Sequence, residues 1–132
     1  FNEPTATVNQ AAIAHNVEPG QIVKTIALNL EKPILLMTSG DVKIDNKKYK
    51  NYFKKKAEML SADDTLKYTS HPIGGVCPFG LPNKIDIYAD VSLNAYDLVI
   101  PAAGSEKSSV KIMRERLLKI TRAKLVDVTK NK

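Results

Sequence analysis

The stretch Ile22–Thr38 reads IVKTIALNLEKPILLMT, and it decides the fold that we predict for this chain. Its first half, Ile22–Leu30, repeats apolar residues with a period of two, which is typical of a β-strand with one buried side. Lys24 falls on that same apolar side. The second half, Pro33–Thr38, is short and apolar and predicts a second strand directly after the first.

Patterns outside this stretch predict helices and further strands. The expected helices are one with capping-box spacing from Thr7 to Gln10 that ends near Glu18, Pro19 and Gly20, one over Asp45–Leu60, one over Ser61–Tyr68 and one over Arg114–Thr121. The expected strands are Ile85–Asp90, Leu98–Pro101, Ser109–Ile112 and Lys124–Val128. Because the strands cluster instead of alternating regularly with helices, we predict an α+β fold with a mixed, mostly antiparallel sheet and flanking helices.

Length and composition narrow the class of protein. A chain of 132 residues suits one domain, residues 1–132, and no stretch approaches the roughly 20 apolar residues of a membrane span. The first ten residues lack the pattern of a signal peptide, and the only cysteine is Cys77, so we expect a cytoplasmic protein without an internal disulfide. The net charge of +6 suits a partner that carries phosphate.

Lysines concentrate in one part of the chain. Seven of them lie between Lys43 and Lys56, and Tyr49, Tyr52 and Phe53 recur among them at helical spacing. We interpret the aromatic residues as core. The lysine side is either a solvated helix face or a stripe that contacts nucleic acid.

The twelve residues His71–Pro82 read HPIGGVCPFGLP and hold three glycines and three prolines. Proline fixes φ and glycine admits backbone conformations that a side chain forbids, so such a loop can present main-chain N–H groups to a carbonyl oxygen or a phosphate. The alternative is a tight connection between a helix and a strand.

Lys24 is the most distinctive single residue. A lysine on the apolar face of a strand must extend its ammonium to the surface, pair with an anion, or lose its proton. Extension to the surface at a strand end is one reading. The functional reading is an ammonium at the mouth of a pocket that takes a substrate phosphate or carbonyl.

Other chemistries have weaker support. His71 and Cys77 could form a thiol nucleophile with its base, but both lie in one loop, whereas such pairs normally come from distant segments. Asp86 and Asp90 fall on one side of a predicted strand, and we expect Asp90 to serve a turn or a hydrogen bond before acid–base chemistry. One cysteine and two separated histidines offer no metal-ligand spacing, so we expect neither a metal nor another cofactor.

Several segments together resemble the YbaK and prolyl-tRNA-synthetase-associated family of aminoacyl-tRNA editing domains. They are Thr7–Ala12 (TVxxAA), Glu18–Ile26 (EPGQIVKTL), Gly74–Gly80 (GGVSPFG), Ile87–Leu93 (YxDxSL), Ala102–Ser105 (AAGS) and Lys119–Val128 (LTGAxVxDV). The resemblance covers almost the whole chain in order, beginning at the TVxxAA helix, before which the family usually has a further strand and helix.

The resemblance implies hydrolysis of a mischarged amino acid from the 3′ end of a tRNA. It implies that Lys24 is essential and that the loop containing Gly74, Gly75 and Pro78 positions the aminoacyl carbonyl. The residues expected around the substrate are Thr25, His71, Val76, Cys77, Phe79, Gly80, Asp90, Ala103, Gly104 and Ser105. The residues expected to contact tRNA are Lys47, Lys50, Lys54 and Lys55.

The leading hypothesis is therefore a trans-acting aminoacyl-tRNA deacylase in which water is the nucleophile and a small amino acid, such as Cys, Ala, Ser or Thr on tRNA-Pro, is removed. The alternatives are an inactive module that binds tRNA or a synthetase, and an editing domain of a prolyl-tRNA synthetase. The histidine of the HPxxN motif in the family's alanine-specific branch is missing near Ala102–Ser105, and Ser109 stands about where the cysteine-editing branch often has an acidic residue. The amino acid therefore does not follow from the resemblance.

Overall fold

The computed structural model describes residues 12–13, 17–71, 76–79, 81–101 and 111–131. Its elements, in chain order, are η1 (Pro19–Gln21), β1 (Ile22–Leu30), β2 (Lys32–Ser39), β3 (Val42–Ile44), α2 (Asn46–Phe53), α3 (Ala62–Thr69), β4 (Asp86–Asp90), η2 (Val91–Ala95), β5 (Leu98–Pro101), β6 (Ile112–Met113), α4 (Arg114–Thr121), β7 (Lys124–Val126) and β8 (Thr129–Asn131).

Six strands form one sheet in the order β6-β5-β1-β2-β4-β7, and β3 pairs with β8 in a separate two-stranded ribbon. The predicted α+β fold with a mixed sheet and flanking helices is confirmed. Within the six-stranded sheet, however, β1–β5, β2–β4 and β4–β7 are parallel, and only β1–β2 and β5–β6 are antiparallel. The expectation of a mostly antiparallel sheet was therefore wrong, because the later strands join the sheet beside strands far away in sequence.

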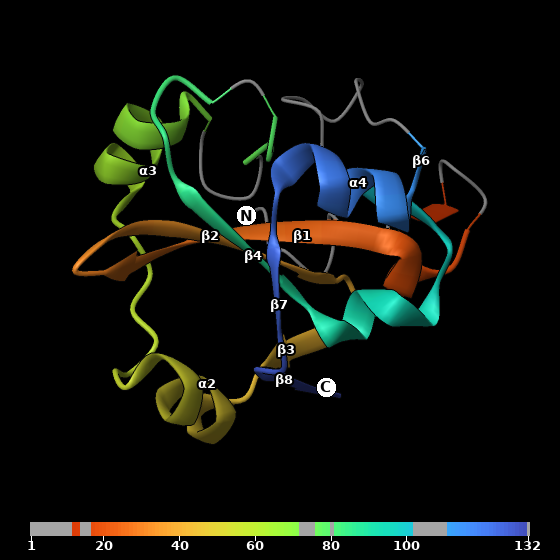
Figure 1. Ribbon diagram of the computed structural model, residues 1–132, viewed down its shortest axis with the longest axis horizontal. Coiled ribbons are helices and arrows are strands. Elements are labelled where there is room, and N and C mark those ends of the chain that lie inside the picture. The colour runs from red at the N-terminus through yellow and green to blue at the C-terminus, as the bar shows by residue number, and fades with distance from the viewer. Residues whose placement is uncertain (1–11, 14–16, 72–75, 80, 102–110, 132) are drawn as a thin grey trace.

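Apolar side chains cover both faces of the sheet. Val23, Ala27 and Met37 point to one face and pack with Leu117 of α4. Leu28, Ile34 and Leu36 point to the other face and pack with Tyr49 of α2 and with Val128. Figure 1 shows α3 and α4 above the sheet and α2 with the β3–β8 ribbon below it. Residues 34–39 of the central strand β2 are therefore buried on both sides.

The lysine-rich helix is shorter than the predicted Asp45–Leu60. It begins after Asp45, whose carboxylate accepts the backbone N–H groups of Lys47 and Lys48, and it ends at Phe53. Lys54 adopts a left-handed conformation with φ of 62° and closes the helix. The chain beyond it then bonds to β1, since Leu60 N–H donates to the Ala27 carbonyl at 3.1 Å. Competition from the sheet edge decides this boundary.

The remaining elements agree with the prediction in most places. The helix predicted over Ser61–Tyr68 is α3, with the Ser61 hydroxyl as its N-terminal cap, and α4 matches the prediction over Arg114–Thr121. The strand predicted over Lys124–Val128 stops at Val126, and β3 and β8 were not predicted. Of the strand predicted over Ser109–Ile112, residues up to 110 lie outside the described part, and β6 begins at Ile112. No described helix is long and apolar enough to cross a lipid bilayer.

Candidate functional site

Lys24 lies in β1, paired across the hairpin with Thr38 of β2. Its side chain is half-buried, and its Nζ donates a hydrogen bond to the Val42 carbonyl oxygen at 2.6 Å. Strand alternation places it on the face that carries Ile26 and Leu28, where the β3–β8 ribbon lies. The ammonium is therefore held by a backbone carbonyl of β3, a partner that no sequence pattern could have indicated.

The segment that leads into the glycine-rich loop is fixed by side-chain bonds. The Thr69 hydroxyl donates to the Thr65 carbonyl at 2.7 Å and accepts the His71 backbone N–H at 3.0 Å. Ser70 closes α3 in a left-handed conformation with φ of 64°. His71 is half-buried and serves as the first residue of the loop.

The described part of the loop, residues 76–79, belongs to the core. Val76, Cys77 and Pro78 are buried, and Val76 and Phe79 pack with Val23 on the sheet face opposite to Lys24. The described residues therefore do not bring the Lys24 ammonium together with this part of the loop. Gly74, Gly75 and Gly80 lie outside the described residues, as do Ala103, Gly104 and Ser105.

Thr25 follows Lys24 in sequence but faces the opposite side of the sheet. It shares that side with Val23 and Ala27, against which Val76 of the loop packs. The Thr25 hydroxyl is buried, with no hydrogen-bond partner among the residues that the structure describes. The sequence argument grouped the two residues because they are neighbours, and strand alternation separates them.

Burial governs the chemistry of Cys77. Its side chain is 5% exposed, and desolvation raises the pKa of the thiol, while a 3.4 Å hydrogen bond from the Phe79 N–H to Sγ acts in the opposite, weaker sense. A nucleophilic cysteine requires the thiolate, which a raised pKa disfavours. The described side chains also contain no cluster of His, Cys, Asp and Glu that could hold a metal ion.

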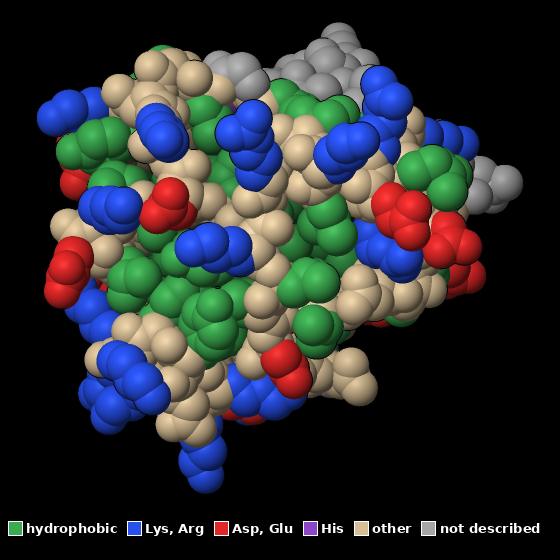
Figure 2. Space-filling model, in the orientation of Figure 1, with side chains coloured by type: hydrophobic (Ala, Val, Ile, Leu, Met, Phe, Trp, Pro, Cys, Tyr) green, Lys and Arg blue, Asp and Glu red, His purple; other side chains and the backbone are tan. Residues whose placement is uncertain are grey.

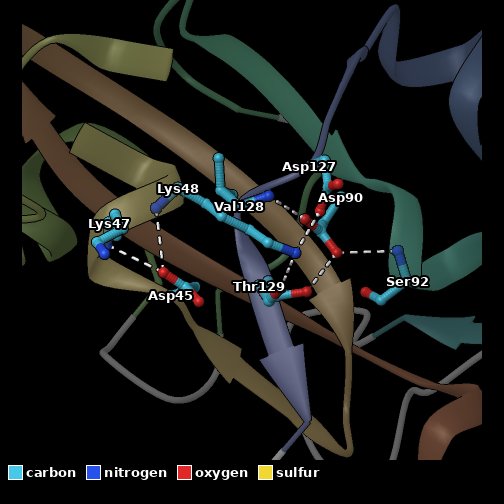
Figure 3. Close-up of polar contacts among 8 residues, drawn as sticks. All are labelled: Asp45, Lys47, Lys48, Asp90, Ser92, Asp127, Val128 and Thr129. Atoms are coloured by element: carbon cyan, nitrogen blue, oxygen red, sulfur yellow. Dashed lines mark hydrogen bonds and ion pairs between the residues drawn. The ribbon is translucent and has the colours of Figure 1, made fainter. Parts of the chain in front are cut away.

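The two strand carboxylates serve different environments. Asp86 is exposed and pairs with Lys32 at 3.2 Å, whereas Asp90 is completely buried. The Asp90 carboxylate accepts the N–H groups of Ser92 at 2.9 Å and Val128 at 2.8 Å, and the Thr129 hydroxyl at 2.6 Å (Figure 3). The hydrogen-bonding role expected for Asp90 is present, and the two aspartates do not form an acid–base pair.

The four lysines expected to contact tRNA are all exposed. Lys47 and Lys50 lie on α2, and Lys54 and Lys55 follow it. Lys55 has a carboxylate neighbour, Glu58, at 3.9 Å. Figure 2 shows basic side chains over the α2 region at the lower left, with hydrophobic surface above them. Tyr49 and Phe53 belong to the core as predicted, but Tyr52 is 49% exposed, so the expectation that it is a core residue was wrong.

Comparisons with known proteins identify the family. The model of the aminoacyl-tRNA editing domain matches residues 2–120. "Uncharacterized protein YwhH" of Bacillus subtilis (strain 168) is 41% identical over 99% of this chain and 85% of its own length. "Proline--tRNA ligase" of Syntrophus aciditrophicus (strain SB) is 31% identical over 83% of this chain, which corresponds to 19% of the ligase.

Solved structures agree with this assignment. A crystal structure of "a putative trans-editing enzyme for prolyl tRNA synthetase" superposes with a TM-score of 0.88 at 26% identity and covers 99% of this chain and 84% of its own. The structure of "hypothetical protein APE2540" superposes with a TM-score of 0.84 at 26% identity, over 98% of this chain and 88% of its own. The resemblance noted in the sequence is thereby confirmed, and this chain belongs to the aminoacyl-tRNA editing domain family.

Proposed function

We propose that this chain is an aminoacyl-tRNA deacylase that acts in trans and hydrolyses the ester of a mischarged tRNA. The substrate class that we favour is a small amino acid, such as Cys, Ala, Ser or Thr, on tRNA-Pro. Family membership supports the reaction type, and the similarity to proline–tRNA ligases supports the tRNA.

The observation that carries the proposal is the placement of the Lys24 ammonium. The resemblance assigns the essential role to this lysine, and the structure holds its Nζ at 2.6 Å from the Val42 carbonyl in a half-buried position. A charge that is oriented in advance and partly shielded from water interacts more strongly with a substrate anion than a freely solvated one does. Lys24 would hold the terminal phosphate or the carbonyl of the substrate while water attacks.

The state of Cys77 supports water as the nucleophile. Burial keeps the thiol protonated because it raises its pKa, and its sulfur accepts the Phe79 N–H. The oxyanion that forms during ester hydrolysis needs hydrogen-bond donors, and we assign that task to backbone N–H groups of the loop around Gly74 and Gly75. Such a donor stabilises the transition state by about 2.7 to 4 kcal/mol.

The exposed lysines at α2 support tRNA binding. Lys47, Lys50, Lys54 and Lys55 lie close together in sequence on the surface, and each phosphate contact releases counterions from the nucleic acid. The exposed ring of Tyr52 stands among them, with its centroid 4.8 Å from that of Phe53. This surface would bind the body of the tRNA, while Lys24 would act on its 3′ end.

Two other functions compete with this one. An inactive module that binds tRNA or a synthetase would use the lysine surface alone and would not need Lys24. An editing domain within a prolyl-tRNA synthetase would perform the same chemistry in another context, and the match to 19% of a proline–tRNA ligase supports it. The 85% coverage of YwhH supports the trans-acting form.

A panel of charged tRNAs tests the proposal. The purified chain is incubated with Cys-, Ala-, Ser-, Thr- and Pro-tRNA-Pro, and the released amino acid is measured against buffer alone. We expect hydrolysis of at least one of the four mismatched substrates, with Pro-tRNA-Pro left intact. Tight binding of tRNA without hydrolysis of any substrate would establish the inactive binding module instead.

A further inference from the structure

Asp90 is a completely buried carboxylate that accepts three hydrogen bonds from neutral donors. Its partners are the N–H groups of Ser92 and Val128 and the hydroxyl of Thr129, at 2.6 to 2.9 Å. No ion pair to Asp90 occurs among the residues that the structure describes. A buried carboxylate without a cation is costly unless its oxygens are fully hydrogen-bonded, so these contacts hold their donors in a definite arrangement.

Two of those donors belong to the segment that leads into the β3–β8 ribbon. Each strand of this ribbon has only three residues, and a lone two-stranded hairpin is marginally stable at best. Polar contacts therefore have to fix it to the body of the protein. Figure 3 shows Asp90 bonded to Val128 and Thr129, with Lys48 reaching the same segment from α2.

The Lys48 contact strengthens the same attachment. Its Nζ donates to the Thr129 carbonyl at 3.0 Å and to the Asp127 carboxylate at 3.1 Å. The N–H of Asp45 also donates to the Val128 carbonyl at 2.8 Å. Thr129 is thus held through its hydroxyl by β4 and through its carbonyl by α2.

The ribbon in turn holds Lys24. Thr129 of β8 pairs with Ile44 of β3, and Val42 of the same short strand supplies the carbonyl that accepts the Lys24 Nζ. A shift of β8 would therefore move the acceptor of the Lys24 ammonium. The path runs from the Asp90 carboxylate to the Thr129 hydroxyl, across one strand pairing to β3, and along β3 to the Val42 carbonyl.

We propose that Asp90 and Thr129 are positioning residues that set the location of the Lys24 ammonium through the β3–β8 ribbon. This goes beyond the proposed deacylase, and its consequence for catalysis rests on the role proposed there for Lys24. It replaces substrate contact as the role of Asp90, because a completely buried carboxylate with three internal donors is closed to a substrate.

The test uses Thr129→Val, which keeps the branched shape and removes the hydroxyl that donates to Asp90. Thr129→Ser restores the hydroxyl. Thr65→Val is the matched control, since the Thr65 hydroxyl is buried without a partner among the described residues, on the helix α3. Lys48→Met is a milder second variant at the surface, which loosens the same strand if Thr129→Val does not fold.

Two measurements are made on each folded variant. The first is the NMR signal of the Lys24 side chain in protein labelled at the lysine ε-carbon, assigned by its loss in Lys24→Arg. The second is kcat for deacylation together with KM for the charged tRNA. We expect Thr129→Val to shift the Lys24 signal and to lower kcat roughly tenfold, as loss of one hydrogen bond in the path would, with KM little changed.

Thr129→Ser should return both values toward those of the parent protein, Lys48→Met should shift the signal in the same direction by less, and Thr65→Val should change neither. A Lys24 signal that stays in place in folded Thr129→Val and in Lys48→Met would overturn the proposal. A shifted Lys24 signal with unchanged kcat would support the positioning path and instead refute the catalytic role proposed for Lys24, so the two failures are distinguishable.

Discussion

Replacement of Lys24 by methionine tests the proposed chemistry most directly. Methionine keeps an unbranched apolar stem in β1 and removes only the ammonium. The lost interaction is the 2.6 Å bond to the Val42 carbonyl, and a hydrogen bond to a charged group contributes about 1.5 to 3 kcal/mol. Lys24→Met should therefore be measurably less stable than the parent protein.

The magnitudes separate a stability effect from a catalytic one. A domain of ordinary stability, about 5 kcal/mol or more, that loses about 3 kcal/mol still has all but a few per cent of its molecules folded. Unfolding alone can thus reduce the rate by only a few per cent. Loss of a charge that stabilises the transition state reduces it by roughly a hundredfold or more, by analogy with the removal of one oxyanion donor.

The assay combines urea unfolding with single-turnover deacylation of the substrate that the parent protein hydrolyses best. We expect a cooperative unfolding transition at a lower urea concentration and a rate at least about a hundredfold below that of the parent. Lys24→Arg serves as the companion variant, because it keeps the positive charge but presents a planar, wider group. A folded Lys24→Met protein that hydrolyses its substrate within a few per cent of the parent rate would refute the reasoning.

The remaining predictions concern the thiol, the lysine surface and a buried phenol. Cys77→Ala should deacylate at nearly the parent rate, because burial raises the pKa of the thiol and keeps it protonated; an acyl group trapped on Cys77 would contradict this. Changing the tRNA-facing lysines to glutamine should weaken tRNA binding and flatten its salt dependence, whereas an equal loss of charge elsewhere should not, which filter binding across salt concentrations would show. The residues changed are Lys47, Lys50, Lys54 and Lys55 in the first variant, and Lys111, Arg116, Lys119 and Lys124 in the control. Tyr49→Phe removes a buried hydroxyl that has no partner among the described residues and should stabilise the protein by about 1 kcal/mol at pH 7. Burial raises the pKa of Tyr49 when folded, so the parent loses stability as the pH rises above the ordinary tyrosine value of 10.0 and Tyr49→Phe should lose less, as urea unfolding at pH 7 and pH 10.5 would reveal; equal losses would contradict it.

Local patterns in the sequence determined most of the regular elements and the family. Strand alternation over Ile22–Leu30 and the Ser61 cap of α3 are properties of neighbouring residues, so they could be predicted without knowledge of the fold. The same holds for the segments that resemble the editing domains, since motif spacing is a property of the chain. Lys24 was singled out because a charge interrupts an apolar face, and this signal too is local.

Only the tertiary structure decided where distant segments meet. The lysine-rich helix ends at Phe53 because the residues after it bond to β1, and the segment predicted as one strand divides after Val126 because Asp90 accepts the N–H of Val128. The Val42 carbonyl that holds Lys24 belongs to a three-residue strand whose partner lies at the other end of the chain. Each of these contacts joins groups separated by many residues, and their free energy depends on burial and geometry that arise only when the whole chain is folded.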